Sequence, residues 1–318
     1  MQMADALRIG CIGCGGNGRW HLRTLAGLPD VKVVGLADTS PAMLELARKA
    51  AAPLAAAPAF ADYRDLIRKV EMDGVLISTP HTLHFRHISD CLSAGLHVLA
   101  EKPLACSVAE AKKLAAQARA AKRQIVVSFQ RRFMAMRKFV RNHVRDPSFG
   151  KPVFVQAFVS QAWPQFTKGT WRQRPKLAGG GQINDPGAHI VDMIHWTLPS
   201  RPVEVTAMMH NRGTGVDVDS AVAFHCSDGC VGSPAVLGDG PLNVFWEDMT
   251  IAGAKGQAVF LRQGAVTIST GTEIAEYKNF GNDLAPDAHF VAVDLLILSS
   301  PQMANLQEGV PVFERHGG

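Results

Sequence analysis

A glycine-rich turn near the N-terminus constrains the fold more than any other feature. Gly13-Cys14-Gly15-Gly16-Asn17-Gly18 is a GxGxxG sequence that follows an apolar strand pattern at 7–13 and opens a helical pattern at 17–28. A second strand pattern, at 31–38, ends in an acid, Asp38. Strand, glycine turn, helix, strand and acid in this order predict a βαβ unit that binds a dinucleotide with its diphosphate at the helix N-terminus.

The three glycines of the GxGxxG pattern and the acid after the second strand each have a physical role. Gly13 allows a tight turn, Gly15 lets the backbone approach the diphosphate, and Gly18 lets the helix pack closely on the strand. Asp38 is placed to accept hydrogen bonds from a ribose 2′-hydroxyl and to repel a 2′-phosphate, and no Arg follows it. The cofactor prediction is therefore NAD, with NADP less favoured, held by Gly13, Gly15, Gly16, Asn17, Gly18 and Asp38.

The first part of the chain continues to alternate short apolar runs with helical patterns. Strand patterns lie at 7–13, 31–38, 58–60, 73–79, 97–103 and 124–130, with helical patterns at 17–28, 41–51, 62–69, 84–95 and 107–121. This alternation predicts an α/β domain over 1–128, a Rossmann-type doubly wound parallel sheet. Beyond a helix at 133–145, strand patterns follow one another between Gly, Asp and Asn turns. We expect a second domain over 129–318, with a mostly antiparallel sheet.

Two further strand ends in the first domain carry polar residues. Ser78-Thr79-Pro80 closes the strand at 73–79, His84 follows at a helix start, and Glu101-Lys102-Pro103 closes the strand at 97–103. Ligands of open α/β sheets bind at the carboxyl ends of the strands. We therefore predict cofactor contacts at Thr79, Pro80, His84, Glu101 and Lys102. The alternative for Glu101 and Lys102 is an ordinary exposed ion pair.

The stretch INDPGAHIVDMIHW at 183–196 permits three interpretations. Asp185 before Pro186 has the form of a helix N-cap with proline in the first turn. Asp185, His189 and Asp192 fall on roughly one helix face and could bind a metal. His189 could instead exchange a proton near neutral pH. The predicted nicotinamide site and the charge of Lys102 argue against a metal, so none is expected.

Taken together, these motifs resemble the Gfo/Idh/MocA family of NAD(P)-dependent oxidoreductases. The resemblance runs through GCIGCGGNG, Asp38, STPHTLH, AGLHVLAEKPLA, FQRRFMA and AGGGQINDPGAHIVDMIHW, in the order and at the distances of the family. It implies a Rossmann domain followed by an α/β domain with a large open sheet, which often forms an oligomer interface. One departure is His81, where the family often has Asn.

The resemblance also implies roles for individual residues. Lys102 would touch substrate and nicotinamide ribose, Asp185 would bind a substrate hydroxyl, and His189 would be the acid/base. Thr79, His84 and Glu101 map to cofactor contacts, and Trp171-Arg172 resembles a pair that reaches toward the nicotinamide. The predicted catalytic set is therefore Lys102, Asp185 and His189, with Trp171 added for substrate and Arg172 for cofactor; Trp163 and Arg131 are further candidates for the pocket wall.

The resulting functional prediction is an NAD-dependent dehydrogenase or reductase that acts on a secondary alcohol of a sugar, inositol or related polyol. Two alternatives remain: a redox-neutral enzyme that oxidises a sugar only transiently, and a sensor without catalysis. The net charge is +5, and the basic residues at 112–145 alternate with apolar ones, which indicates solvated helix faces and no nucleic-acid partner.

We also expect no membrane association, because no apolar run reaches the length of a membrane span. The first ten residues lack a secretory signal, so a cytoplasmic location is expected. By resemblance we expect a homodimer or homotetramer. Cys226 and Cys230 flank a hairpin turn, and a disulfide or metal role is the less favoured alternative to buried thiols.

Overall fold

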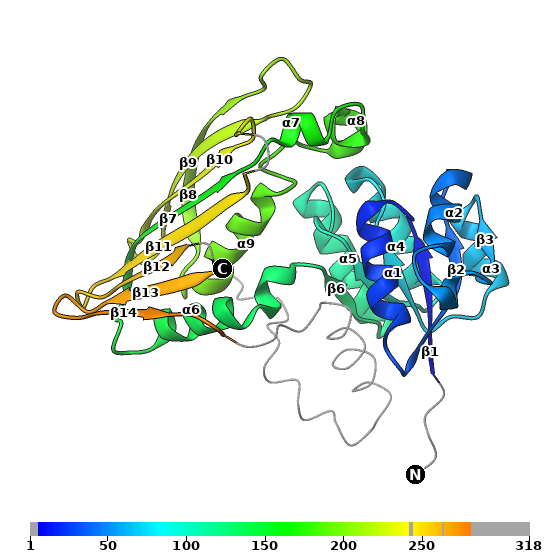
Figure 1. Ribbon diagram of the computed structural model, residues 1–318, viewed down its shortest axis with the longest axis horizontal. Helices are drawn as coiled ribbons and strands as arrows, with labels where there is room; N and C mark the ends of the chain where they lie inside the picture. The colour runs from blue at the N-terminus through cyan, green and yellow to red at the C-terminus, as the bar shows by residue number, and fades with distance from the viewer. Residues whose placement is uncertain (1–5, 242–243, 263, 281–318) are drawn as a thin grey trace, which may run out of the picture.

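The structure is a computed structural model that describes residues 6–241, 244–262 and 264–280. The predicted second domain extends to residue 318, and its portion at 281–318 lies outside the described residues. Residues 1–5 of the first domain also lie outside them. Figure 1 shows two sheets in separate parts of the molecule, with α7, α8 and α9 on the side of the second sheet that faces the first part.

The first sheet is fully parallel and has the strand order β3-β2-β1-β4-β5-β6. Its strands are β1 (Leu7–Ile12), β2 (Val31–Ala37), β3 (Ala59–Phe60), β4 (Gly74–Ile77), β5 (His97–Ala100) and β6 (Ile125–Val127). The helices between them are α1 (Gly16–Ala26), α2 (Pro41–Arg48), α3 (Tyr63–Lys69), α4 (His84–Ser93) and α5 (Val108–Ala121). The order reverses between β1 and β4, as in a doubly wound sheet, which confirms the predicted fold class.

Helices cover both faces of this parallel sheet. Leu22 and Leu25 of α1 and Leu44 of α2 pack with Cys11 and Leu76 on one face. Alternate strand residues point to the other face, where Ile12, Val75, Ile77 and Val98 pack against Leu66 of α3, Ile88 of α4 and Leu114 of α5. This two-sided burial explains why the strands are nearly continuous apolar runs.

The second sheet has eight strands in the order β14-β13-β12-β11-β7-β10-β9-β8. They are β7 (Pro152–Ser160), β8 (Pro202–His210), β9 (Asp219–Cys226), β10 (Val231–Leu237), β11 (Trp246–Gly253), β12 (Ala258–Arg262), β13 (Ala265–Ser269) and β14 (Ile274–Tyr277). All neighbours are antiparallel except β7 and β10, which are parallel. The prediction of a large, mostly antiparallel sheet is therefore confirmed.

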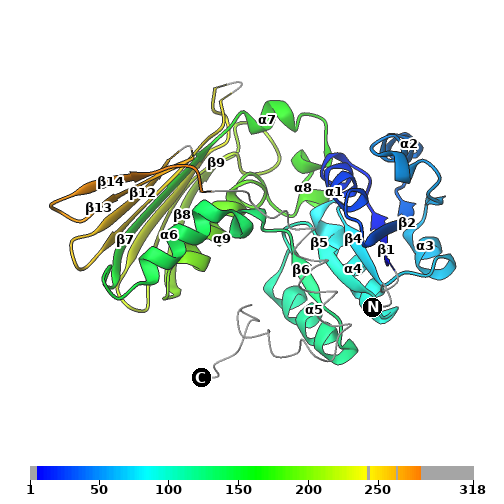
Figure 2. The same ribbon diagram turned by 60° about the horizontal axis from the view of Figure 1, so that its bottom comes forward.

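The helices within the described part of the chain cover only one face of the second sheet. Figure 2 shows α6 (Ala135–Arg145) and α9 (Gly187–Thr197) on that face. Val140, Val144, Ile190 and Ile194 of these helices join the buried residues of β7 and β11 in one core. Among the described helices, none combines the length and apolar character required to cross a membrane.

The strand β7 ends at Ser160, and Trp163 begins the short helix α7 (Trp163–Phe166). Pro164, at the first turn of α7, has no N–H with which to continue a strand ladder.

Candidate active site

The glycine turn adopts the conformation that its sequence predicts. Gly13 has a φ of +94°, and a Cβ there would lie 2.4 Å from the Ser78 carbonyl oxygen. A Cβ on Gly18 would lie 2.1 Å from the Gly13 oxygen, so the first turn of α1 can pack on the loop only without a side chain. These two glycines close the turn tightly over the end of β4.

The N-terminus of α1 is open toward the pocket. Gly15 is the N-cap and no side chain caps the helix, while a Cβ on Gly15 or Gly16 would meet nothing within 4 Å. The first backbone N–H groups of α1 therefore have space in front of them, which is the arrangement that binds a phosphate group.

Asp38 follows β2 and contacts the glycine turn. Its Oδ2 accepts a 2.8 Å hydrogen bond from the Cys14 N–H, and its Oδ1 accepts one of 2.8 Å from the Ser40 N–H. Each carboxylate oxygen can accept more than one hydrogen bond. The carboxylate thus fixes the turn and retains acceptor capacity for ribose hydroxyls.

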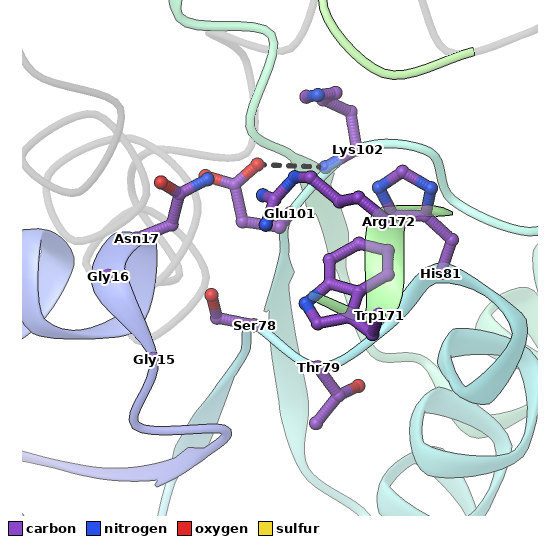
Figure 3. Close-up of a pocket in the computed structure, with 10 residues that line it drawn as sticks. All are labelled: Gly15, Gly16, Asn17, Ser78, Thr79, His81, Glu101, Lys102, Trp171 and Arg172. Carbon is purple, nitrogen blue, oxygen red and sulfur yellow. Dashed lines mark hydrogen bonds between the residues drawn. The ribbon is translucent and has the colours of Figure 1, made fainter. Parts of the chain in front are cut away.

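A pocket lies at the carboxyl ends of the parallel strands, where the strand order reverses (Figure 3). It is lined by Gly15, Gly16, Asn17, Ser78, Thr79, His81, Glu101, Lys102, Trp171 and Arg172. In Figure 3 the glycine turn and Asn17 lie opposite His81, Trp171 and Arg172. Trp171 and Arg172 belong to the short 3-10 helix η4 (Trp171–Gln173), so both parts of the molecule contribute to this pocket.

Lys102 and Asp185 form a buried ion pair between the two parts of the molecule. The Lys102 Nζ donates to Asp185 Oδ1 at 2.7 Å and to the Asp185 carbonyl oxygen at 2.8 Å. Lys102 is 6% exposed and Asp185 is 5% exposed. The alternative of an exposed Glu-Lys pair at 101–102 is therefore wrong, because Lys102 points away from solvent and bonds a residue 83 positions away.

The second oxygen of Asp185 has two further donors. Oδ2 accepts 2.9 Å hydrogen bonds from Trp163 Nε1 and from Arg172 Nε. Burial alone would raise the pKa of the Asp185 carboxyl, but the charges of Lys102 and Arg172 outweigh it and hold this pKa well below its usual range. Asp185 is thus a fixed anion that orients three donors around itself.

These contacts correct the helix-cap interpretation of Asp185. The N-cap position of α9 belongs to Pro186, and no side chain caps the helix. The Asp185 carboxylate faces Lys102, Trp163 and Arg172 instead, because three strong donors are available there.

Glu101 is held from behind by α1. His21, which is fully buried, contacts Glu101 Oε1 through Nε2 at 2.9 Å. Burial would raise the pKa of the Glu101 carboxyl, but His21 and Lys102 lower it below its usual value. Glu101 is therefore an anion at the floor of the pocket.

Thr79, Pro80 and His84 take different positions relative to the pocket. Thr79 lines it and contacts His87 Nδ1 through Oγ1 at 3.0 Å. His84 is fully buried, with Nδ1 2.6 Å from the Pro103 oxygen and Nε2 2.9 Å from the Thr79 oxygen. His84 and Pro80 are not among the lining residues. The geometry makes His84 a link between the two strand ends.

His189 lies in the first turn of α9 and is 7% exposed. Its ring is edge-on to Phe129 at 6.1 Å, and Nδ1 has no hydrogen-bond partner in the part of the chain that the structure describes. Asp192, one turn further, pairs with Arg132 through Oδ2 and Nε at 2.9 Å. The structure thus separates Asp192 from Asp185, and we find no metal cluster among the described residues.

Two pocket residues, Ser78 and His81, are missing from the predicted site. Both flank the predicted Thr79-Pro80, and their place at the end of β4 is the signal that could have identified them.

Arg131, a candidate for the pocket wall, pairs with Glu247 instead. Burial raises the pKa of the Cys230 thiol to about 12 and also raises that of Cys226, which disfavours thiolate chemistry at this hairpin.

Comparison with known proteins agrees with this architecture. The sequence model described as oxidoreductase family, NAD-binding Rossmann fold (GFO/IDH/MocA) matches residues 7–129, and that of the GFO/IDH/MocA C-terminal domain matches 138–259. The solved structure of levoglucosan dehydrogenase in complex with NADH and levoglucosan has a TM-score of 0.76 at 20% identity, covering 88% of this chain and 83% of that one.

Two curated relatives are each 30% identical. The 1,5-anhydro-D-fructose reductase of Ensifer adhaerens matches over 48% of this chain and 45% of its own length. The rhizopine catabolism protein MocA of Rhizobium meliloti matches over 61% and 58%. The chain therefore spans about half the length of these relatives.

Proposed function

Because the chain belongs to the GFO/IDH/MocA oxidoreductase family, whose first domain is an NAD-binding Rossmann fold, we propose that it transfers a hydride between NAD and a secondary alcohol of a sugar, inositol or related polyol. The observation that carries this proposal is the buried Lys102–Asp185 pair, because Lys102 lines the same pocket as Gly15 and Gly16 at the open N-terminus of α1. The similarity to a 1,5-anhydro-D-fructose reductase and to a levoglucosan dehydrogenase supports the substrate class.

The pocket fits the dinucleotide by its own chemistry. The uncapped first turn of α1 would hold the diphosphate, and Asp38 would accept hydrogen bonds from the ribose. Thr79, Glu101 and Arg172 would line the nicotinamide end. NAD, when bound, supplies a hydride acceptor at its nicotinamide ring.

The chain's own residues would handle the substrate oxygen and its proton. In the oxidation direction, the alcohol loses a hydride from carbon and a proton from oxygen, and becomes a ketone. His189 would accept the proton, and the remaining N–H of Lys102 would stabilise the negative charge that develops on the oxygen. Asp185, with three donors already placed, has acceptor capacity left for a substrate hydroxyl.

Substitution of His189 tests this assignment. Sugars and inositols are screened for NADH formation, and His189→Ala is expected to lower kcat by about 10²–10⁴-fold with a nearly unchanged dissociation constant for NAD. His195→Ala, an exposed histidine on the same helix, is the matched control.

The possible outcomes separate the alternatives. Near-normal turnover by the His189 variant would exclude this residue as the base. Substrate conversion without net NADH would favour the redox-neutral alternative, and a wild-type protein that binds NAD but converts no polyol would favour a sensor.

We further propose that the second face of this sheet, which no described helix covers, is buried between subunits of a homodimer or homotetramer. Met208 of β8 is 83% exposed, Val231 of β10 is 49% exposed, and Phe154 of β7 is 43% exposed. Exposed apolar area of this kind commonly marks an interaction surface. A mass measurement in solution distinguishes these assemblies from a monomer.

A further inference from the structure

His81 is a pocket residue to which the proposed mechanism gives no task. It begins the 3-10 helix η2 (His81–Leu83), directly after the strand end at Pro80, and is 4% exposed. In Figure 3 its ring lies next to Arg172 and Trp171, and the Trp171 ring is edge-on at 4.7 Å. The residue therefore meets the second part of the molecule at the substrate side of the pocket.

The two ring nitrogens of His81 have different surroundings. Nδ1 lies 3.0 Å from the Ala178 carbonyl oxygen, which can only accept, so Nδ1 carries the hydrogen. Burial lowers the pKa of His81 to about 4; Asp185 raises it, while Lys102 and His84 lower it further. The ring is therefore neutral at pH 7, and Nε2 presents a lone pair.

The lone pair of Nε2 has no donor among the described residues. Asp185 Oδ1 lies 4.0 Å from Nε2 and is also an acceptor. Lys102 donates hydrogen bonds to the Asp185 carboxylate and carbonyl oxygens. Since His81 lines the pocket, a ligand bound there can supply an O–H group to this acceptor.

The Nδ1 side serves a different purpose. Together with the Ala178 contact, Thr82 Oγ1 donates to the carbonyl oxygens of Lys176 at 3.0 Å and Leu177 at 3.2 Å. These bonds fasten α8 (Pro175–Ala178), and with it the adjoining η4, to the end of β4. The two nitrogens of one imidazole can therefore serve two purposes: Nδ1 holds α8 in place, and Nε2 is available to a ligand.

We propose that His81 selects substrates: its Nε2 accepts a hydrogen bond from a second hydroxyl of the polyol, beside the hydroxyl bound by Lys102 and Asp185, while its Nδ1–H holds α8 in place. This inference rests on the proposed polyol dehydrogenase function. It assigns the chain a preference for substrates with a free hydroxyl next to the reacting one.

Two substitutions separate the two nitrogens. In His81→Asn the amide nitrogen can take the place of Nδ1 and the Nε2 acceptor is lost. In His81→Gln the side-chain amide reaches the place of Nε2 and the bond to Ala178 is weakened. Thr82→Val breaks the other contact to α8 without altering the pocket lining and is the matched control.

The experiment compares levoglucosan and myo-inositol with their monodeoxy derivatives. It measures kcat/KM and, by calorimetry, binding of each compound to the protein saturated with NADH. The wild type is expected to reject one deoxy derivative by about 10–100-fold or more, since a site built for a hydroxyl leaves a polar group unpaired without it. His81→Asn should bring this ratio close to one, whereas His81→Gln and Thr82→Val should retain most of it.

Each outcome decides a different claim. A ratio that His81→Asn leaves unchanged, in a folded variant with normal NADH binding, overturns this inference alone. An equal loss in Thr82→Val assigns the effect to the placement of α8 and overturns the role of Nε2. Failure of the wild type to turn over any polyol overturns the proposed function and this inference with it.

Discussion

Backbone groups form one side of the pocket, the cofactor wall at Gly13–Gly18, whereas side chains form the other, the substrate wall around Lys102 and Asp185. The cofactor wall is largely backbone: a turn of six residues, two of whose glycines exclude a Cβ by contacts shorter than 2.5 Å. The substrate wall consists of side chains, with Lys102, Trp163 and Arg172 converging on one carboxylate from separate segments. The glycine turn is formed by neighbouring residues of the chain. The donors around the Asp185 carboxylate come together only after both parts of the molecule have folded.

The largest test of this difference is removal of the Lys102 charge. Lys102→Met keeps an apolar side chain of similar length but removes the donor to the substrate oxygen. We expect kcat to fall about 10³-fold, the effect of losing one donor to a developing oxyanion. Asp185 keeps Arg172 and Trp163 as partners, so the loss of folding stability should be smaller than for a fully orphaned carboxylate.

Arg132→Met is the matched control, because it breaks the ion pair to Asp192, and neither Arg132 nor Asp192 lines the pocket. We expect a loss of about 3 kcal/mol in unfolding free energy from the unpaired buried carboxylate, and little change in kcat once the variant is folded. If Lys102→Met lowered the melting temperature as much as Arg132→Met and left kcat intact, Lys102 would be a structural residue only.

Groups in and beside the pocket should also lose their stabilising effect in two different ranges of pH. On the side of the β4 end, burial lowers the pKa of both His81 and His87 to about 4 from 6.5. The unfolded chain therefore binds more protons between pH 6.5 and 4. The free energy of unfolding that the two neutral histidines contribute is complete above pH 6.5. It is lost as the pH falls toward 4, by up to about 3 kcal/mol for each histidine.

The pKa of Asp185 is also lowered, although burial alone would raise it, because the charges of Lys102 and Arg172 outweigh burial. Its lowered pKa gives stability that is present above the unfolded value and is lost only in stronger acid. Urea unfolding at pH 7, 5.5 and 4.5 should thus show a decline that His87→Gln reduces and that His210→Gln, on the exposed strand β8, does not. An unchanged slope in the His87 variant would contradict this account.

The sequence could predict the cofactor wall nearly completely and the substrate wall only in part. The turn at Gly13–Gly18, the acid at Asp38 and the parallel sheet follow from local spacing and alternation. Residue types at 102 and 185 are also visible in the sequence, but their 2.7 Å contact crosses 83 positions. The role of His81 is set by the Ala178 carbonyl, 97 positions away, which no pattern within the β4 segment encodes.

The smallest expected effect concerns Asp38, whose side chain supports the backbone turn of the cofactor wall. Asp38 both fixes the turn, through Cys14 and Ser40, and is predicted to bind ribose. Asp38→Asn retains an acceptor for the turn and removes the charge; Asp38→Ala removes both. We expect each to weaken NAD binding about tenfold, or about 1.4 kcal/mol, and to reduce discrimination against NADP.

The pair of variants separates the two roles of Asp38. If repulsion of a 2′-phosphate is the work of the charge, NADP binding, measured by fluorescence titration, should improve equally in both variants. If the hydrogen bonds to the turn matter more, Asp38→Ala should lose affinity for both dinucleotides while Asp38→Asn keeps it. If neither variant changed the selectivity for NAD over NADP, Asp38 would not be the residue that recognises the ribose. Local sequence would then predict the shape of the cofactor wall better than its chemistry.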